Sequence, residues 1–255
     1  MKYSGFNTLK EALDAHRVWA LGEENGKRAD FSGANLSSAN LGGAYLSNAD
    51  LGGVNLNGAN LRGAFLSRAN LIAANLSGAN LSRADLIGTN LGGANLIGAN
   101  LKFADLSDTN LSSANLSRAN LNDAYLCRAN LIGANLSGAN LKFADLSGAY
   151  LNRVDLKGAK LSGAKLSGAT LENGLSWEQY LSEIVPALCI AGGKSLEEVA
   201  AVWECHSWEN CPMHVAFGVN SLKKIPALYQ FEAQRFVRFF DQKLIPNPIM
   251  TLGVQ

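Results

Sequence analysis

Leucine recurs at every fifth position across more than half of this 255-residue chain. Residues 29–173 divide into 29 consecutive frames of five without insertion or deletion, and the third position is Leu in every frame but the first, which has Phe31. The first position is Ala in all but four frames, and the second is Asn or Asp in 22. This period fits neither an amphipathic helix, which repeats every ~3.6 residues, nor a strand, which repeats every ~2. Self-similarity at a fixed short period instead predicts a solenoid.

The five positions have distinct expected roles. Ala at position one and Leu at position three lie two residues apart, so both can point inward along one short extended side. Burying each Leu stabilises the fold by roughly 1.5–3 kcal/mol. Position two lies outside, and positions four and five turn the corner; Gly closes 15 frames, as suits a turn residue with positive φ. The residues that replace Ala are slightly larger, which predicts local widening of the core at Val54, Thr89, Thr109 and Val154.

This motif, a small residue followed by Asn or Asp, Leu and two variable residues, resembles that of the pentapeptide-repeat family over residues 29–173. The resemblance implies a mainly β fold: a right-handed quadrilateral β-solenoid with four repeats to a coil, hence about seven coils of 20 residues. At a strand spacing of about 4.8 Å, such coils would form a rod roughly 35 Å long.

The solenoid is flanked by two segments of different composition. Residues 1–28 are predicted to form an N-terminal helical cap, with a helix over residues 8–21 that begins with a capping box at Thr8 and Glu11. His16, on the apolar stripe of this helix, is interpreted as a packed histidine rather than a ligand. Residues 174–255 are predicted to form a small C-terminal α-helical domain, whose first helix begins at Ser176. A Phe-rich last helix makes a homodimer through this domain a further hypothesis.

The outer surface differs from side to side when frames are compared at 20-residue spacing. One side carries almost only Asn at position two, whereas another carries aromatic residues there and at the corner leading into it. Exposed aromatic residues and Arg are typical of interface anchors, although stacked aromatics could instead stiffen one side of the solenoid. The candidate protein-binding residues, here called the aromatic face, are Tyr45, Phe65, Arg83, Phe103, Tyr125 and Phe143.

The C-terminal segment contains one group of potential metal ligands or nucleophiles: Cys205, His206, Cys211 and His214. Four such side chains could bind zinc, and a Cys with a His could act as a nucleophile. The spacing departs from the usual zinc patterns, because Cys205 and His206 are adjacent and five residues separate the two cysteines. We favour a packed loop over a zinc-dependent module, and assign no catalytic residue, no metal ligand and no cofactor.

Charge limits the remaining functional classes. The chain has a net charge of +1, and the repeats hold 11 basic and nine acidic residues, so direct nucleic-acid binding is not expected. Some pentapeptide-repeat proteins are strongly acidic rods that mimic DNA and protect DNA gyrase from quinolones; this sequence lacks that charge density, and gyrase modulation is kept as the alternative. The sequence predicts a non-enzymatic scaffold that binds a protein partner through the aromatic face or the C-terminal domain. Four cysteines, and the lack of a signal peptide or a membrane-spanning apolar run, favour a cytoplasmic protein.

Overall fold

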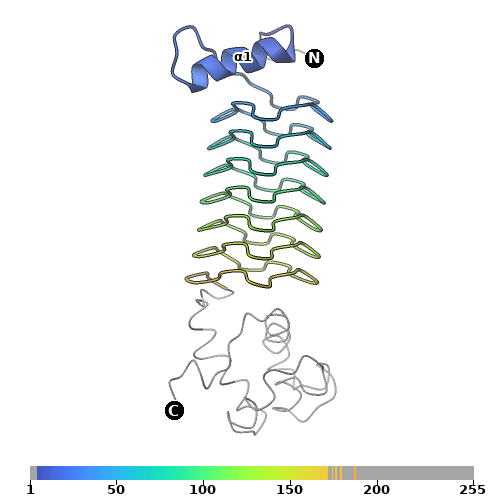
Figure 1. Cartoon of the computed structure of the whole chain (residues 1–255), viewed down its shortest axis with the longest axis vertical. Helices are drawn as coiled ribbons and strands as arrows, with labels where there is room; N and C mark the ends of the chain where they lie inside the picture. The colour runs from blue at the N-terminus through green and yellow to red at the C-terminus, as the bar shows by residue number, and fades with distance from the viewer. Residues whose placement is uncertain (1–4, 172–173, 175, 177–178, 180–186, 188–255) are drawn as a thin grey trace. The chain divides into compact units, whose positions relative to one another are not determined.

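A computed structural model describes residues 5–171 together with Gly174, Ser176, Gln179 and Ala187. From residue 29 the backbone winds in stacked coils (Figure 1). Parallel β-bridges join position-two residues that are 20 apart in sequence, from Asp30–Asp50 to Tyr150–Thr170. Four repeats therefore make one coil, as predicted. Each contact is a bridge of single residues, and no longer strand occurs in the described part of the chain.

A repeat inside the stack can satisfy all five of its backbone N–H groups, as the frames beginning at Ala34 and Val54 together show. The N–H of position three donates to the next coil (Leu36 N to Asn55 O, 2.7 Å), as does that of position five (Ser38 N to Asn57 O, 2.9 Å). The N–H of position two donates to the preceding coil, as in Asn55 N to Ala34 O at 2.9 Å, and that of position one closes the corner on the carbonyl three residues earlier. Position four donates to the side chain of position two. Full pairing is required because buried, unpaired backbone groups are costly.

The bond from the position-four N–H to the position-two side chain explains why position two is usually Asn or Asp. Each of the 22 Asn and Asp residues at position two accepts from the N–H two residues later; Ser37 N to Asn35 Oδ1, at 3.1 Å, is one example. Several Asn amides also donate to the preceding coil, as Asn55 Nδ2 does to Asn35 Oδ1 at 3.1 Å. Position two is therefore a structural hydrogen-bonding position rather than a merely outward one.

The interior is built from the predicted Leu and Ala residues, and most Leu side chains between Leu36 and Leu171 are fully buried. Val54, Thr89 and Thr109 are also fully buried. The prediction for the two threonines considered only their size. Their hydroxyls in fact donate to carbonyl oxygens of the preceding coil, Thr89 Oγ1 to Leu66 O and Thr109 Oγ1 to Leu86 O, each at 2.9 Å. These bonds allow polar atoms inside an apolar core.

The corners require a positive φ at position five, as the glycines predicted. Several corners nevertheless carry other residues in this left-handed region, including Arg118 with φ 58°. A non-glycine residue there is strained by about 1–2 kcal/mol. Gly98, at the same corner one coil earlier, adopts φ 64° without crowding.

Replacing Arg118 by glycine is therefore expected to stabilise the protein by roughly 0.5–1 kcal/mol, because relief of strain outweighs the greater freedom of glycine in the unfolded chain. Chemical denaturation of the full chain measures the difference. A loss of stability would mean that the Arg118 side chain makes a stabilising contact on the solenoid surface.

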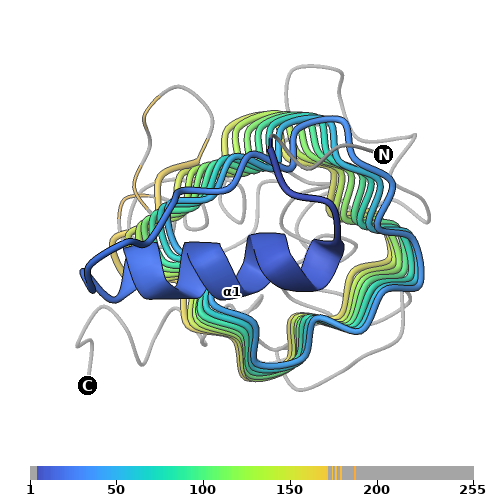
Figure 2. The ribbon, with the colours of Figure 1, turned by 90° about the horizontal axis from the view of Figure 1, so that it is seen from above.

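Helix α1 spans Leu9–Ala20, within the predicted range. Thr8 is its N-cap, and Thr8 Oγ1 accepts from Glu11 N at 3.1 Å. The reciprocal bond of the predicted capping box is shifted by one residue, because Glu11 Oε2 accepts from the N–H of Asn7 rather than from that of Thr8. Viewed from above, α1 lies across the coils that follow it (Figure 2).

His16 joins α1 to the first coil. It is fully buried; Ala29 N donates to its Nδ1 at 3.1 Å, and its Nε2 lies 3.1 Å from Ser47 O. Because Nδ1 accepts, the neutral ring carries its proton on Nε2, which donates to the Ser47 carbonyl. The ring also contacts Trp19 and Phe31, at centroid distances of 5.3 and 6.5 Å. His16 is thus the packed histidine that the sequence predicted.

Of the predicted C-terminal domain, only isolated residues are described. Ser176 Oγ accepts from Gln179 N at 3.0 Å, and Ser176 N donates to Gln179 Oε1 at 2.9 Å, which is the reciprocal pattern of a capping box. The predicted helices after this point lie outside the described residues.

Candidate protein-binding face

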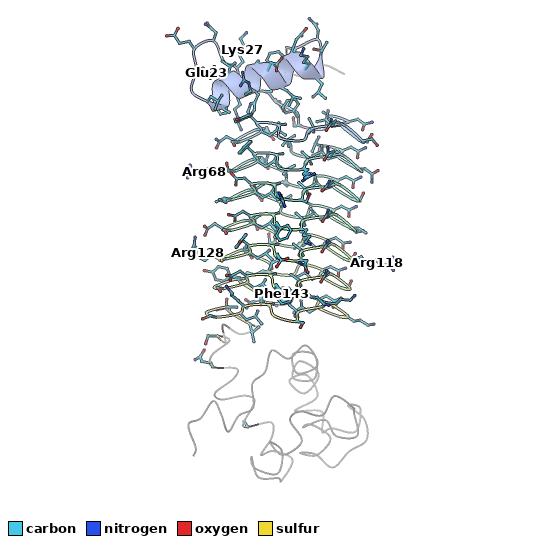
Figure 3. All side chains as sticks on the ribbon, in the orientation of Figure 1. Glu23, Lys27, Arg68, Arg118, Arg128 and Phe143 are labelled. Carbon is cyan, nitrogen blue, oxygen red and sulfur yellow. The ribbon has the colours of Figure 1, made fainter. Side chains whose placement is uncertain are left out.

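The fold places the aromatic face on one side of the solenoid and on the corner that leads into it. Tyr45, Phe65 and Tyr125 occupy position two in a single column of bridges, Tyr45–Phe65–Asp85–Asp105–Tyr125–Asp145–Lys165. Arg83, Phe103 and Phe143 occupy position five of the frames just before this column. Figure 3 shows Phe143 between the side with Arg68 and Arg128 and the opposite side with Arg118.

Two local contacts organise the aromatic side chains. Tyr45 and Phe65 stack at a centroid distance of 4.8 Å and an interplanar angle of 22°. Phe103 receives two cations, Lys102 Nζ at 4.7 Å and Arg83 Cζ at 5.7 Å from its ring centroid. Tyr125 and Phe143 are the most exposed of the set, at 53% and 61%. These rings therefore remain available to a partner rather than forming part of the core.

Where position two is aromatic, the repeat lacks the hydrogen bond that an Asn or Asp side chain there accepts from the N–H two residues later. Phe and Tyr offer no acceptor next to the backbone there, and within the described residues the N–H groups of Ser47, Ser67 and Cys127 have no protein acceptor. In the Asn frames, the equivalent N–H always bonds Oδ1. Loss of such a bond reduces stability by about 0.5–1.5 kcal/mol. The aromatic residues therefore work against the stability of their own repeats.

The leading corner adds backbone strain on the same side. Position five is non-glycine in four successive coils, at Arg83, Phe103, Asp123 and Phe143, with φ between 56° and 61°. The preceding coil has Gly63 at this place with open space around it. Non-glycine residues at positive φ occur at the other corners too, but only this corner carries them in four successive coils of the described solenoid. Strain that is concentrated in this way is typical of functional sites.

The trailing corner holds a charged pair. Arg128 Nε and Nη2 donate to Asp108 Oδ1 and Oδ2 at 2.7 and 2.6 Å, a bidentate arrangement between two exposed side chains. The hydrogen bonds from Arg128 hold the pKa of Asp108 below its ordinary value. Exposed pairs of this kind contribute little to stability, so this pair mainly fixes the charge pattern beside the aromatic face.

Asp145, Cys127 and Lys165 form a second polar group next to Tyr125. Burial acts to raise the pKa of Asp145, but bonds from Ser147 and the nearby Lys165 outweigh it and hold the pKa below its ordinary value. Burial, followed by the charge of Asp145, raises the pKa of the Cys127 thiol. Cys127 is therefore a protonated, half-buried thiol at neutral pH rather than an activated nucleophile.

The other candidate sites receive no structural description. Cys205, His206, Cys211 and His214 lie outside the described residues, as does the predicted dimerisation helix. Among the residues that are described, no three His, Cys, Asp or Glu side chains gather in a way that could hold a metal ion. The described residues also include no helix long and apolar enough to cross a membrane.

Lys102 was not among the residues selected from the sequence, nor were Arg62 and Lys142. All three occupy position four of the leading corner. The signal for them in the sequence is a basic residue that recurs at position four of this corner every 40 residues. The corner is therefore more basic than the sequence-based set suggested.

The family model for pentapeptide repeats matches residues 29–68, 66–102, 104–142 and 134–173, as eight copies that together cover more than half of the chain. The chain belongs to the pentapeptide-repeat family. Proteins of this family are generally non-enzymatic structural and interaction modules with a right-handed β-helical fold. No curated protein matches the chain in a sequence comparison.

Similar solved structures are also pentapeptide-repeat proteins. HetL, involved in heterocyst differentiation regulation in the cyanobacterium Nostoc sp. strain PCC 7120, shares 34% identity over 59% of this chain and 81% of its own, with a TM-score of 0.28. QnrB1, a plasmid-mediated fluoroquinolone resistance protein, shares 24% over 55% of this chain and 82% of its own, with a TM-score of 0.32. A protein of the Arabidopsis thaliana thylakoid lumen shares 29% over 46% of this chain and 70% of its own, with a TM-score of 0.22. The family assignment rests on the repeats, not on these superpositions.

Proposed function

We propose that this protein is a non-catalytic scaffold that binds a protein partner through the aromatic face. The observation that carries the proposal is a coincidence of two unfavourable features on one side of the solenoid. Three aromatic residues at position two of one column give up a backbone hydrogen bond, and the adjoining corner carries non-glycine residues at positive φ in four successive coils, as no other corner of the described solenoid does. Repeats elsewhere in the same chain show that Asn and Gly would fit better at these positions. Selection for binding explains why the fold retains both features.

The competing explanation, that the aromatic side chains stiffen the solenoid, makes the opposite stability prediction. The triple variant Tyr45→Asn, Phe65→Asn and Tyr125→Asn introduces the residue that occurs most often at position two in the two neighbouring columns. We expect it to leave the fold as stable as the natural chain or more stable, because each Asn can accept the N–H two residues later, as Asn35 does for Ser37. We also expect it to lose partner binding by more than about tenfold.

The partner can be identified first by replacing Tyr125 with a photoreactive phenylalanine analogue and sequencing the cross-linked protein. Calorimetry with that purified partner then gives the affinities of the natural chain and the triple variant. Tyr150→Asn is the matched control, because Tyr150 is an exposed aromatic at position two on a different side, bridged to Asn130 and Thr170. Unchanged affinity in the triple variant, or a clear loss of stability, would reject binding by the aromatic face.

DNA mimicry, and with it the gyrase-directed function that the resemblance suggested, receives less support. Its structural requirement is a dense anionic surface that replaces phosphates. Here Asp108 and Asp145 are neutralised by Arg128 and Lys165, and the leading corner of the aromatic face is basic. The similarity to a fluoroquinolone resistance protein does not supply the missing charge.

A further inference from the structure

The leading corner of the aromatic face carries a continuous run of cations and exposed aromatic side chains. Arg62, Arg83 and Lys142 are exposed, Lys102 is half-buried, and Phe103 and Phe143 are 42% and 61% exposed. We call this surface the basic–aromatic ridge; its members are Arg62, Arg83, Lys102, Phe103, Lys142 and Phe143.

The ridge cations have no acidic partner in the part of the chain that the structure describes. The two ion pairs found there are Arg128–Asp108 and Lys165–Asp145, both on other parts of the surface. Arg83 and Lys102 instead lie over the ring of Phe103. Asp123 is the one acidic residue at this corner, against four basic residues, so the corner has a net positive charge.

The two sides beside the ridge differ in charge. One is the aromatic column, where Asp85, Asp105 and Asp145 occupy position two; the other is the Asn column from Asn40 to Asn140, which is neutral. An anionic partner is therefore attracted to the ridge and repelled from the aspartates, so it lies over the ridge and the asparagines. An extended polyanion such as single-stranded nucleic acid fits poorly, because Asp85 and Asp105 lie beside the middle of the cationic stretch, in the coils of Arg83 and Lys102.

Spacing along the ridge indicates the shape of the partner. Phe103 and Phe143 are two coils apart, which at about 4.8 Å per coil is about 10 Å. Side chains on one face of a strand recur every ~6.6 Å, whereas residues seven apart on a helix are separated by about 10.5 Å and share a face. A helix laid along the ridge therefore presents apolar residues to both phenylalanines.

We infer that the partner contacts this ridge through an acidic amphipathic helix with apolar residues seven positions apart. The inference rests on the proposed function, to which it adds the chemistry of the partner. The acidic side chains pair with the unpaired cations, and the apolar ones cover the exposed phenylalanine rings. Charge complementarity of this kind gives specificity and makes binding depend on salt.

The experiment uses fluorescence anisotropy with the full chain and a labelled helical peptide that carries two Leu seven residues apart, flanked by Glu. A second peptide has Gln in place of every Glu. The ridge variant is Arg83→Gly, Lys102→Gln and Lys142→Gln. Its matched control, Arg118→Gly, Arg153→Gly and Lys157→Gln, removes three exposed cations from other corners and changes the net charge equally.

We expect the acidic peptide to bind, to bind more weakly as salt is raised, and to lose about tenfold in affinity, or about 1.4 kcal/mol, in the ridge variant but not in the control. The inference is overturned if the peptide does not bind, if the Gln peptide binds equally well, or if both variants lose affinity alike. Binding of an oligothymidylate in place of the peptide would overturn it too.

The same variants separate this inference from the proposed function. If the cross-linked partner keeps its affinity for the ridge variant but loses it for the Tyr45, Phe65 and Tyr125 variant, the aromatic face binds and the ridge does not. If neither variant affects the partner, both proposals fail.

Discussion

Replacing Leu96 by alanine is expected to lower the free energy of unfolding by about 3–5 kcal/mol. Leu96 is fully buried and stacks in register between Leu76 and Leu116, as the bridges Asn75–Asn95 and Asn95–Asn115 require. The N–H of Leu96 donates to Asn115 O in the next coil at 2.7 Å. The backbone around the site is therefore fixed on both sides and cannot collapse into the space that the side chain leaves. Urea denaturation of the full chain measures the change.

Ile97→Ala is the matched control, because Ile97 is the next residue but its side chain is 40% exposed at the corner. A surface substitution of this kind changes stability by no more than about 0.5 kcal/mol. Similar values for the two variants would contradict the assignment of position three to the core and position four to the surface. A loss below about 1 kcal/mol for Leu96→Ala would mean that the coils can move to fill the cavity.

The core could be predicted because the same five-residue pattern recurs in every frame. Each Leu such as Leu96 occurs at the same place in a five-residue frame, and a single inward orientation accounts for Leu at position three and Ala at position one together. The 20-residue register was supplied by the family resemblance rather than by the pattern itself. The bridge between Asn35 and Asn55 agrees with that register, as do the other bridges, each of which joins residues 20 apart.

The function of the asparagines could not be read from outward orientation alone. Position two was correctly placed outside the Leu core, but its importance lies in the N–H two residues later, whose only acceptor in the repeat is the Asn or Asp side chain. The tendency of Asn and Asp to bond the backbone two residues on was the available signal. Without it, the aromatic residues at Tyr45, Phe65 and Tyr125 look like simple surface substitutions. With it, they are departures from a structural requirement.

The candidate site was predictable in outline and incomplete in its charges. A fixed register is enough to place Tyr125 in one column and Phe143 at its leading corner. The cations of the ridge depend on a different position of the frame, and their lack of ion pairs depends on where side chains point, which the sequence does not specify. Lys102 over the ring of Phe103 is the clearest case, because adjacent residues in a corner need not contact each other.

Replacing His16 by leucine is expected to detach helix α1 while leaving the solenoid folded. Leucine fills a similar volume but cannot accept from Ala29 N or donate to Ser47 O, the two bonds that His16 makes at 3.1 Å. Each buried group left without a partner destabilises the contact by about 1–3 kcal/mol. We therefore expect hydrogen exchange of the α1 amides to accelerate by more than about tenfold. The amides around Leu96 should exchange as before, since each coil is held by its own neighbours.

The pH dependence of α1 stability distinguishes the contribution of the His16 hydrogen bonds from that of its packing. Burial, helped by the nearby Arg28, lowers the pKa of His16 below 6.5 even though the bond to the Ser47 carbonyl acts to raise it. Below pH 6.5 the detached histidine takes up a proton that the packed one does not, so stability is complete above that pH and falls as the pH drops toward the pKa of the folded state. Exchange in α1 should therefore accelerate as the pH is lowered below 6.5 in the natural chain, relative to the intrinsic exchange rate at each pH, and this dependence should vanish in His16→Leu. An equal pH dependence in both proteins would place the titrating group elsewhere and leave His16 as a packing residue alone.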